Sequence, residues 1–292
     1  MASMNDIRRS ISSIESTGQI TKAMKMVASS KLRRAQSAVV AARPYAEKVR
    51  EVLGSLSNES GASSNPLMEV REVKKVLYII VSADSGLCGG FNANVTKECE
   101  RAIKANEHEC DVVAVGKRGR DFFRKRGYNL VSEYIEIGDT PTFATGKTIA
   151  QDVIKRYIEG EYDEVHLVYS VFKSALSNTP TDVKVLPIEA LPAEEKAGEE
   201  KEEQGFSLTY SFEPSEEEVL DVLLPAYVET LIYAAILESK ASEHGSRMTA
   251  MSAATDNAME LIQSLTLTLN RARQAAITTE INEIVGGAAA LE

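Results

Sequence analysis

The 292-residue sequence has no tryptophan and only three cysteines and three histidines. Cys88, Cys99 and Cys110 are eleven residues apart. This spacing fits neither zinc ligands nor a Cys-x-x-Cys redox pair, so we interpret the cysteines as buried free thiols. The histidines are isolated from one another and from any Glu-x-x-His pattern, and we interpret them as structural: His108, His166 and His244. The sequence therefore predicts neither a metal site nor a cofactor.

Long apolar runs are also absent. The longest, LLPAYVETLIYAAIL at 223–237, contains Glu229 and falls short of the roughly 20 apolar residues that a membrane-spanning helix needs. It predicts a buried helix instead. The N-terminus lacks the apolar block of a signal peptide. We therefore expect a soluble, cytosolic chain with no cleaved targeting segment.

Basic residues are fewer than acidic residues, 33 against 43, but they are concentrated at the N-terminal end. The formal net charge is -10, yet residues 1–50 hold ten Lys or Arg against Asp6, Glu15 and Glu47. The stretch ITKAMKMVASSKLRRAQ, residues 20–36, has five basic residues and no acidic one. Such asymmetry indicates an acidic partner, which could be nucleic acid, anionic lipid or an acidic protein surface. A solvated helix face is the plain alternative.

The N-terminal segment, residues 1–57, reads as a coiled-coil helix. Ile7, Ile11 and Ile14 have the alternating four- and three-residue spacing of a coiled-coil seam. We expect the register to shift after them to Ile20, Met24 and Val27, with Gly18 at the point of the shift. Pro44 predicts a kink or a junction. From residue 28 onward apolar or small residues alternate at four and three positions, which is a heptad seam: Ala28, Leu32, Ala35, Val39, Ala42, Ala46, Val49, Leu53 and Leu56.

Residues 213–292 predict a second coiled-coil helix. Ser215 and Glu218 suggest a capping box at its start, and Gly286-Gly287 should end it. Because both helices leave the same central domain, they should run antiparallel, and the longer C-terminal one should overshoot. The stretch LIQSLTLTLNRARQAAITT, 261–279, has only Arg271 and Arg273 as charges, so we expect other subunits to sheathe it. Folding back onto its own domain is the alternative.

Residues 73–212 predict a central α/β domain with a mainly parallel sheet, because short β-branched runs alternate with helical stretches. The acidic stretch 192–205 should be an exposed loop. The expected strands lie at 74–83, 110–116, 163–172, 182–188 and 206–212, and the expected helices at 92–106, 117–126 and 143–159. The fold class is therefore α/β: an antiparallel coiled coil of the N- and C-terminal helices plus a central α/β domain.

Two stretches resemble ligand loops. PTFATGKT at 141–148 ends like a P-loop but has Pro141 where the pattern needs glycine. SADSGLCGGFN at 82–92 lacks the G-x-G-x-x-G spacing and reads as a tight turn. No catalytic set can be placed. A nucleic-acid-binding coiled-coil adaptor and an α/β nucleotide hydrolase with coiled-coil arms remain open as other classes of function.

Several longer stretches resemble the gamma subunit, the central rotor shaft, of F-type ATP synthases. They are IRRSISSIESTGQITKAMKMVASSKLRRAQ, RPYAEKV, SGLCGGFN, SRMTAMSAATDNAMELI and NRARQAAITTEINEIVGGAAAL. The resemblance implies a Rossmann-like central domain below an antiparallel coiled coil inside a hexamer of alpha and beta subunits. It also implies catalysis on the beta subunits and coupling to proton or sodium flow by rotation. Gly18 and the acidic 192–205 stretch depart from the family pattern.

The resemblance further implies partners and site residues, with no nucleic acid and no cofactor. The partners are the alpha and beta subunits, the epsilon subunit and the c-subunit ring. The chain would lie peripherally at the cytoplasmic side of a bacterial cell membrane, with membrane contact only through the c ring. Residues implied to face the hexamer are Lys22, Met24, Lys25, Lys31, Arg33, Arg34, Arg247, Arg273, Gln274 and Thr278. Residues implied at the c-ring foot are Tyr210 and Glu213.

Overall fold

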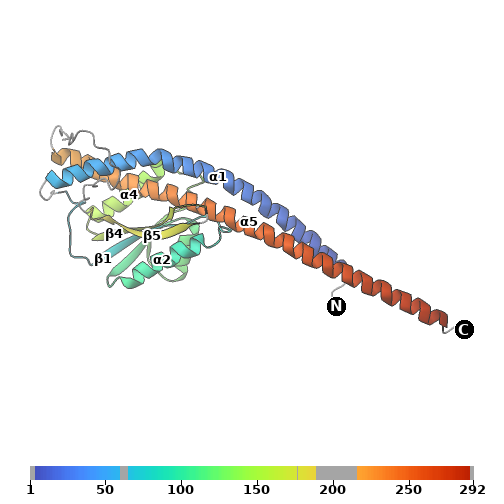
Figure 1. Cartoon of the computed structure of the whole chain (residues 1–292). Coiled ribbons are helices and arrows are strands. Elements are labelled where there is room, and N and C mark those ends of the chain that lie inside the picture. Colours follow the sequence, from blue (N-terminus) through green and yellow to red (C-terminus); the bar gives the residue numbers. More distant parts are fainter. Residues whose placement is uncertain (1–3, 60–64, 176, 189–215, 290–292) are drawn as a thin grey trace. The chain divides into compact units, whose positions relative to one another are not determined.

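The computed structural model describes residues 4–59, 65–175, 177–188 and 216–289. The chain divides into two compact units. We call residues 1–29 with 247–292 the coil unit, and residues 30–246 the sheet unit. Two long helices, α1 (Met4–Glu59) and α5 (Glu216–Ala289), contribute to both units (Figure 1).

The ends of the two helices differ in part from the sequence prediction. α5 continues to Ala289, so the predicted stop at Gly286-Gly287 is wrong. Glycine permits a left-handed cap but does not require one. Pro44 and Pro225 both lie inside their helices, and neither ends a helix. The predicted cap at Ser215 and the strand at 206–212 lie outside the described residues.

In the coil unit, α1 and α5 lie side by side and antiparallel, and α5 continues past the N-terminal end of α1 (Figure 1). The predicted register slip is wrong, because Ile20 and Val27 are 60% and 54% exposed. The seam instead runs through Gly18 and Thr21 to Ala28, with Met24 half-buried between them and the exposed Lys25 reaching across to α5. The prediction followed apolar residues, whereas the first two of these seam positions hold glycine and threonine.

The sheet unit contains one five-stranded sheet in the order β3-β2-β1-β4-β5. β1 to β4 run parallel, and β5 runs antiparallel to β4. The strands are β1 (Lys75–Val81), β2 (Glu109–Val115), β3 (Leu130–Tyr134), β4 (Glu164–Phe172) and β5 (Asn178–Leu186). The sequence analysis missed β3, an edge strand of five residues, none of which is fully buried.

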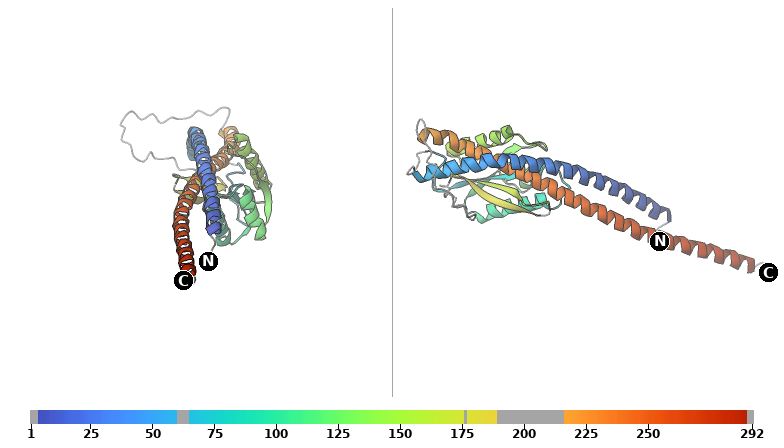
Figure 2. Two further views of the ribbon diagram at one scale, coloured as in Figure 1. Left: turned by 90° about the vertical axis from the view of Figure 1, so that its right-hand side faces the viewer. Right: turned by 45° about the horizontal axis from the view of Figure 1, so that its top comes forward.

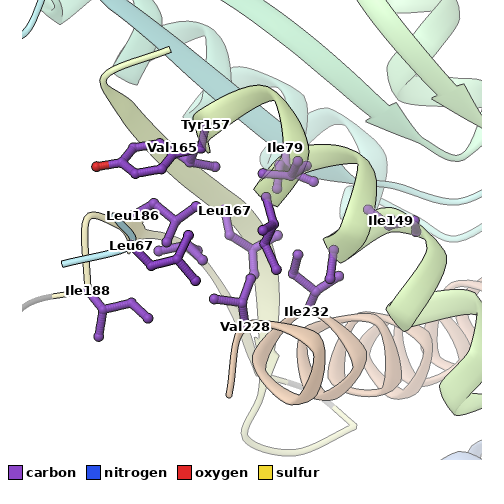
Figure 3. Close-up of a cluster of buried hydrophobic side chains, with 14 of the residues drawn as sticks. Leu67, Ile79, Ile149, Tyr157, Val165, Leu167, Leu186, Ile188, Val228 and Ile232 are labelled. Carbon is purple, nitrogen blue, oxygen red and sulfur yellow. The ribbon is translucent and has the colours of Figure 1, made fainter. Parts of the chain in front are cut away.

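Helices cover both faces of the sheet (Figure 2). α2 (Phe91–Ala105) and α3 (Lys117–Lys125) pack on the face that holds Tyr78 and Ile80. α4 (Phe143–Ile158) and α5 pack on the opposite face. Figure 3 shows this second core, in which side chains from α4, α5, the strands and the segment before β1 meet.

By length and composition, α5 is apolar enough to cross a membrane. Its apolar stretch packs against the sheet instead: Leu224, Val228, Ile232 and Ile236 have no exposed surface. Burial of large aliphatic side chains contributes about 1.5–3 kcal/mol each. The interpretation of residues 223–237 as a buried helix is therefore confirmed, and this contact anchors α5 to the sheet.

Candidate partner-binding surface

The basic residues of α1 differ in how they are used. Lys22 in the coil unit and Arg33 and Arg34 in the sheet unit are exposed, and none of the three makes an ion pair within the described ranges. The Lys25 ammonium donates to the Ser252 hydroxyl at 2.9 Å, across the seam to α5. The outward side chains offer positive charge to an acidic partner.

Lys31 is held by its own chain. Its ammonium lies 2.7 Å from the Asp139 carboxylate, in the connection between β3 and α4. Burial opposes ionisation of Asp139, but the hydrogen bond and charge of Lys31 outweigh it and lower the pKa of the carboxyl. Asp139 also lies 3.6 Å from the buried His244 ring on α5. Asp139 thus joins α1 and α5 in the sheet unit, and both partners of the Lys31 pair remain partly exposed.

Apolar side chains accompany the cations on the outer surface of α1 in the coil unit. Ile20, Met26 and Val27 are 60%, 61% and 54% exposed. Met24, which the resemblance places beside the basic residues, is half-buried. Exposed apolar side chains next to charge are typical of a protein-protein contact surface. The sequence assigned Ile20 and Val27 to the seam and so missed this part of the surface.

The C-terminal part of α5 presents a long surface of apolar and hydroxyl side chains. Ile277, Ile281, Ile284 and Val285 are between 47% and 71% exposed. Arg273, Gln274 and Thr278, which the resemblance assigns to the hexamer contact, are exposed on the same segment, and Arg247 is half-buried at the base of the coil unit. Residues 277–287 are all exposed, so no other element in the described part of the chain covers them.

The hydroxyls of this segment are occupied by their own helix. Four threonines donate to the carbonyl oxygen four residues earlier, at 2.7 to 3.0 Å: Thr266, Thr268, Thr278 and Thr279. Each hydroxyl has one proton, so none of it remains for a fixed bond to a neighbour. The threonines of this segment therefore offer a partner methyl groups and acceptor oxygens, and the exposed donors come from side chains such as Arg273 and Gln274.

The sheet unit has the topology of a nucleotide-binding fold, but its crevice is filled. In such open sheets, ligands bind outside the carboxyl ends of the strands, where the strand order reverses. Here that point lies between β1 and β4. Ser239 of α5 donates to the Val81 carbonyl at 3.3 Å, and Ser242 donates to the Ser170 carbonyl at 3.1 Å.

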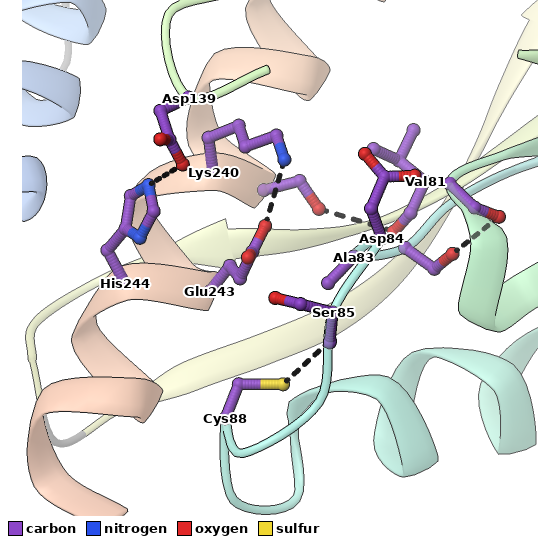
Figure 4. A network of polar contacts seen from close by, with 12 residues as sticks. Val81, Ala83, Asp84, Ser85, Cys88, Asp139, Lys240, Glu243 and His244 are labelled. Atoms are coloured by element: carbon purple, nitrogen blue, oxygen red, sulfur yellow. Dashed lines mark hydrogen bonds and ion pairs between the residues drawn. The ribbon is translucent and has the colours of Figure 1, made fainter. Parts of the chain in front are cut away.

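Charged side chains of α5 complete this filling. The Lys240 ammonium lies 3.0 Å from the Glu243 carboxylate, with side-chain exposures of 10% and 5%. Figure 4 shows the pair beside the loop that follows β1, with His244 turned towards Asp139. The SGLCGGFN segment connects β1 to α2 as a turn, as predicted. Side chains of α5 thus occupy the place where a nucleotide would bind.

The P-loop-like stretch has a structural role. Gly146 lies inside α4, and a β-carbon there would come 2.7 Å from the Tyr233 β-carbon on α5. Only glycine lets the two helices approach so closely. The Lys147 ammonium lies 3.9 Å from the Glu229 carboxylate of α5. Both residues that resemble a phosphate cradle are therefore used to pack and pair α4 with α5.

The remaining candidate groups for catalysis or metal binding are dispersed. Among the described residues, no group of three or more His, Cys, Asp or Glu side chains is placed to hold a metal ion. Cys88 and Cys99 are buried and Cys110 is partly exposed, and all three are free thiols. Burial raises the pKa of Cys110 to about 11, which makes it a poor nucleophile. Tyr210 and Glu213 lie outside the described residues.

Comparisons with known proteins identify the family of the chain. A family model described as ATP synthase matches residues 3–291. The ATP synthase gamma chain of Desulforamulus reducens is 55% identical over the full length of both chains, and that of Pelotomaculum thermopropionicum is 52% identical over the same span.

Solved structures give the same result for the fold. A chain from the central stalk and c-ring of Tetrahymena thermophila mitochondrial ATP synthase matches with a TM-score of 0.61 and 26% identity, over 80% of this chain and 99% of that chain. A chain from the OSCP, F1 and c-ring assembly of Euglena gracilis mitochondrial ATP synthase matches with a TM-score of 0.69 and 20% identity. It covers 99% of this chain and 94% of that chain.

Proposed function

This chain belongs to the ATP synthase gamma-chain family, and we propose that it turns as the rotor shaft within a hexamer of alpha and beta subunits. The observation that carries the proposal is the C-terminal part of α5. Ile277, Ile281 and Ile284 are exposed there, and its threonine hydroxyls are bonded to their own helix. A rod that rotates inside a sleeve needs such a surface, because fixed hydrogen bonds would have to break at every step.

The chain itself performs no catalysis in this proposal. The crevice of its nucleotide-binding topology is filled by Ser239, Ser242 and the Lys240–Glu243 pair. ATP is therefore made or hydrolysed on the beta subunits, and this chain couples them to the flow of protons or sodium ions. Its contribution is mechanical.

The basic residues of α1 provide the contact with the hexamer. Lys22, Arg33 and Arg34 point outward without ion-pair partners among the described residues, so acidic loops of the beta subunits can approach them. Exposed ion pairs contribute only about 0–1 kcal/mol each. Contacts of that strength suit a surface that must release one partner and meet the next during rotation.

The proposed contact with the membrane machinery involves residues that precede α5 in the sequence. We assign Tyr210 and Glu213 to a contact with the c-subunit ring, because they match the family motif before α5, and the epsilon subunit to the same part of the chain. The chain then lies at the cytoplasmic side of a bacterial membrane and meets it only through that ring. The bacterial relatives named above support this placement by identity alone.

Reconstitution tests the proposal. The purified chain should show no ATPase activity, and it should raise the activity of an alpha/beta mixture by completing the complex. A bead attached through Lys125→Cys, an exposed position on α3, in a chain without the three native cysteines, should rotate in steps when ATP is added. Lys147→Ala should leave hydrolysis unchanged. Nucleotide binding by the isolated chain, or a complex that hydrolyses ATP while the bead stays still, would contradict the proposal.

A further inference from the structure

In the coil unit, glycine and polar residues replace apolar ones along the contact between α1 and α5, and they do so at facing positions on the two helices. On α1 the seam holds Gly18 and Thr21, with the exposed Lys25 beside it, and on α5 it holds Thr255, with Ser252 beside it. On either side of this segment the seam is lined by isoleucine, leucine, methionine and alanine. We call the six facing residues the polar gap: Gly18, Thr21, Lys25, Ser252, Thr255 and Ala258.

The polar gap is bonded across the seam. The Thr21 and Thr255 hydroxyl oxygens are 2.8 Å apart, and the Lys25 ammonium donates to Ser252 at 2.9 Å. Thr21 is 8% exposed, so its hydroxyl depends on protein partners. A β-carbon built on Gly18 would lie 3.5 Å from that of Ala258, which is ordinary contact.

Each threonine can also donate to its own helix. Thr21 lies 3.0 Å from the Gly18 carbonyl oxygen, and Thr255 lies 2.8 Å from that of Met251. With one proton on each hydroxyl, one threonine donates across the seam while the other donates to its own backbone. In any other register each hydroxyl would keep only the bond to its own helix, and the bond across the seam would be lost.

An axial slip of one heptad would destroy this match. Thr21 would then face Met248 or Ile262, and Gly18 would face Met251 or Leu265. Both changes place a polar or empty position against a large apolar side chain. The flanking apolar residues discriminate less sharply, since Ile14 would face Leu269 in place of Ile262 when Thr21 faces Ile262. Polar side chains at coiled-coil seam positions are known to specify register at a cost in stability.

We propose that the polar gap fixes the axial register of α1 against α5 in the coil unit. The two helices then carry a load as one body instead of sliding past each other. The register itself is a property of this chain alone. Its importance for transmitting torque rests on the proposed function.

Disulfide trapping tests the register in the full-length chain. In a background with the three native cysteines replaced by alanine, Gly18→Cys with Ala258→Cys should cross-link rapidly under mild oxidation. The expected β-carbon separation of 3.5 Å lies at the short end of the disulfide range. Two slipped reporters, Gly18→Cys with Met251→Cys and Gly18→Cys with Leu265→Cys, should stay reduced. If a slipped pair cross-links as fast as the in-register pair, the register is not fixed and the proposal fails.

Removal of the polar gap is the second arm. Thr21→Val, Thr255→Val and Lys25→Met together keep the size of the side chains and remove both bonds. The slipped reporters should then cross-link at least several-fold faster, while the thermal midpoint stays the same or rises. If the midpoint falls and the slipped pairs remain unreactive, the bonds serve only stability. Thr266→Val, on the exposed side of α5, is the matched control and should change neither measurement.

The assembled complex separates this inference from the proposed function. A chain locked by the 18–258 disulfide should assemble and support ATP hydrolysis, since the lock preserves the native register. If the locked chain assembles normally and the triple variant of the polar gap assembles less well, the fixed register contributes to the function of the shaft. If no variant assembles with alpha and beta subunits, the rotor proposal is wrong, while the cross-linking result still decides the register.

Discussion

The polar side chains of α5 form different kinds of hydrogen bonds in the sheet unit and in the coil unit. In the sheet unit, buried polar side chains of α5 bond to strand carbonyls and to each other, as Ser239, Ser242 and Lys240 do. In the coil unit, the outer threonines bond back to their own helix, and apolar side chains such as Ile281 remain exposed. The sheet unit is thus stabilised by its own chain, whereas the outer surface of the coil unit is suited to other chains.

The largest test of this contrast is Ala276→Asp near the end of α5. In the isolated chain this position is partly exposed, so the thermal midpoint should not change. Inside a sleeve of subunits the carboxylate would lose its water, which costs several kcal/mol when no cation compensates it. Assembly, measured by co-purification and ATP-driven ion pumping, should fail. Thr279→Ser is the matched control and should assemble normally. Normal pumping by Ala276→Asp would show that the segment is not sheathed.

Charge reversal on α1 should have the next largest effect. Lys22→Glu, Lys25→Glu and Arg33→Glu together replace attraction by repulsion at every encounter with an acidic loop. Coupled pumping should fall at least several-fold, and more at low ionic strength, where charges are screened less. Lys31→Ala alone should have little effect, because it removes one partly exposed ion pair of about 0–1 kcal/mol. If Lys31→Ala abolished pumping while the triple reversal did not, the basic surface would have been misassigned.

The sheet unit should respond in the opposite manner, with lost stability and no partner needed. Gly146→Ala would bring a β-carbon 2.7 Å from that of Tyr233, so α4 and α5 would have to separate. Such overpacking costs about 1–3 kcal/mol, and the thermal midpoint of the isolated chain should fall. Gly286→Ala, which meets nothing within 4 Å, is the control in the coil unit. An unchanged midpoint for Gly146→Ala would contradict the close helix packing.

The sequence predicted those parts of the fold in which one chemical signal dominates. Four of the strands and all five helices follow their apolar periodicity, and the seam from Ala28 onward follows its heptads. β3 was missed because Leu130–Tyr134 is short and only half-buried. The register slip was predicted wrongly because Gly18 and Thr21 hold seam positions, and a count of apolar residues does not detect glycine or a hydrogen-bonded threonine.

The candidate site was predictable in composition more than in geometry. The basic residues of α1 and the weakly charged end of α5 are visible in the sequence, and both are exposed. Two features needed three dimensions: Lys31 and His244 meet at Asp139, and α5 fills the crevice between β1 and β4. These contacts join residues more than 50 positions apart, so no local sequence pattern predicts them.

The smallest expected effect is a pH dependence within the sheet unit. The two ring nitrogens of His166 on β4 face two carboxylates, Asp182 at 2.9 Å and Glu164 at 3.6 Å. Only the protonated ring can donate to both. The Glu164 carboxylate also pairs with Lys184 at 2.7 Å, and the ring stacks on Tyr78. Burial lowers the pKa of His166, but its hydrogen bond to Asp182 and the two negative charges outweigh burial and raise the pKa above 6.5.

The raised pKa determines the direction of the pH effect. The folded chain holds this proton more tightly than the unfolded chain, so the stabilisation is fully present below about pH 6.5 and is lost as pH rises through the folded pKa. The thermal midpoint of His166→Gln should therefore differ most from that of the parent at acidic pH and converge with it at alkaline pH. NMR titration of the His166 ring gives the folded pKa directly, and Asp182→Asn should lower it. A midpoint difference that grows with pH, or a His166 pKa below 6.5, would show that the carboxylates do not hold the proton. Because the group lies in the sheet unit, the effect should be equal in the isolated chain and in the assembled complex.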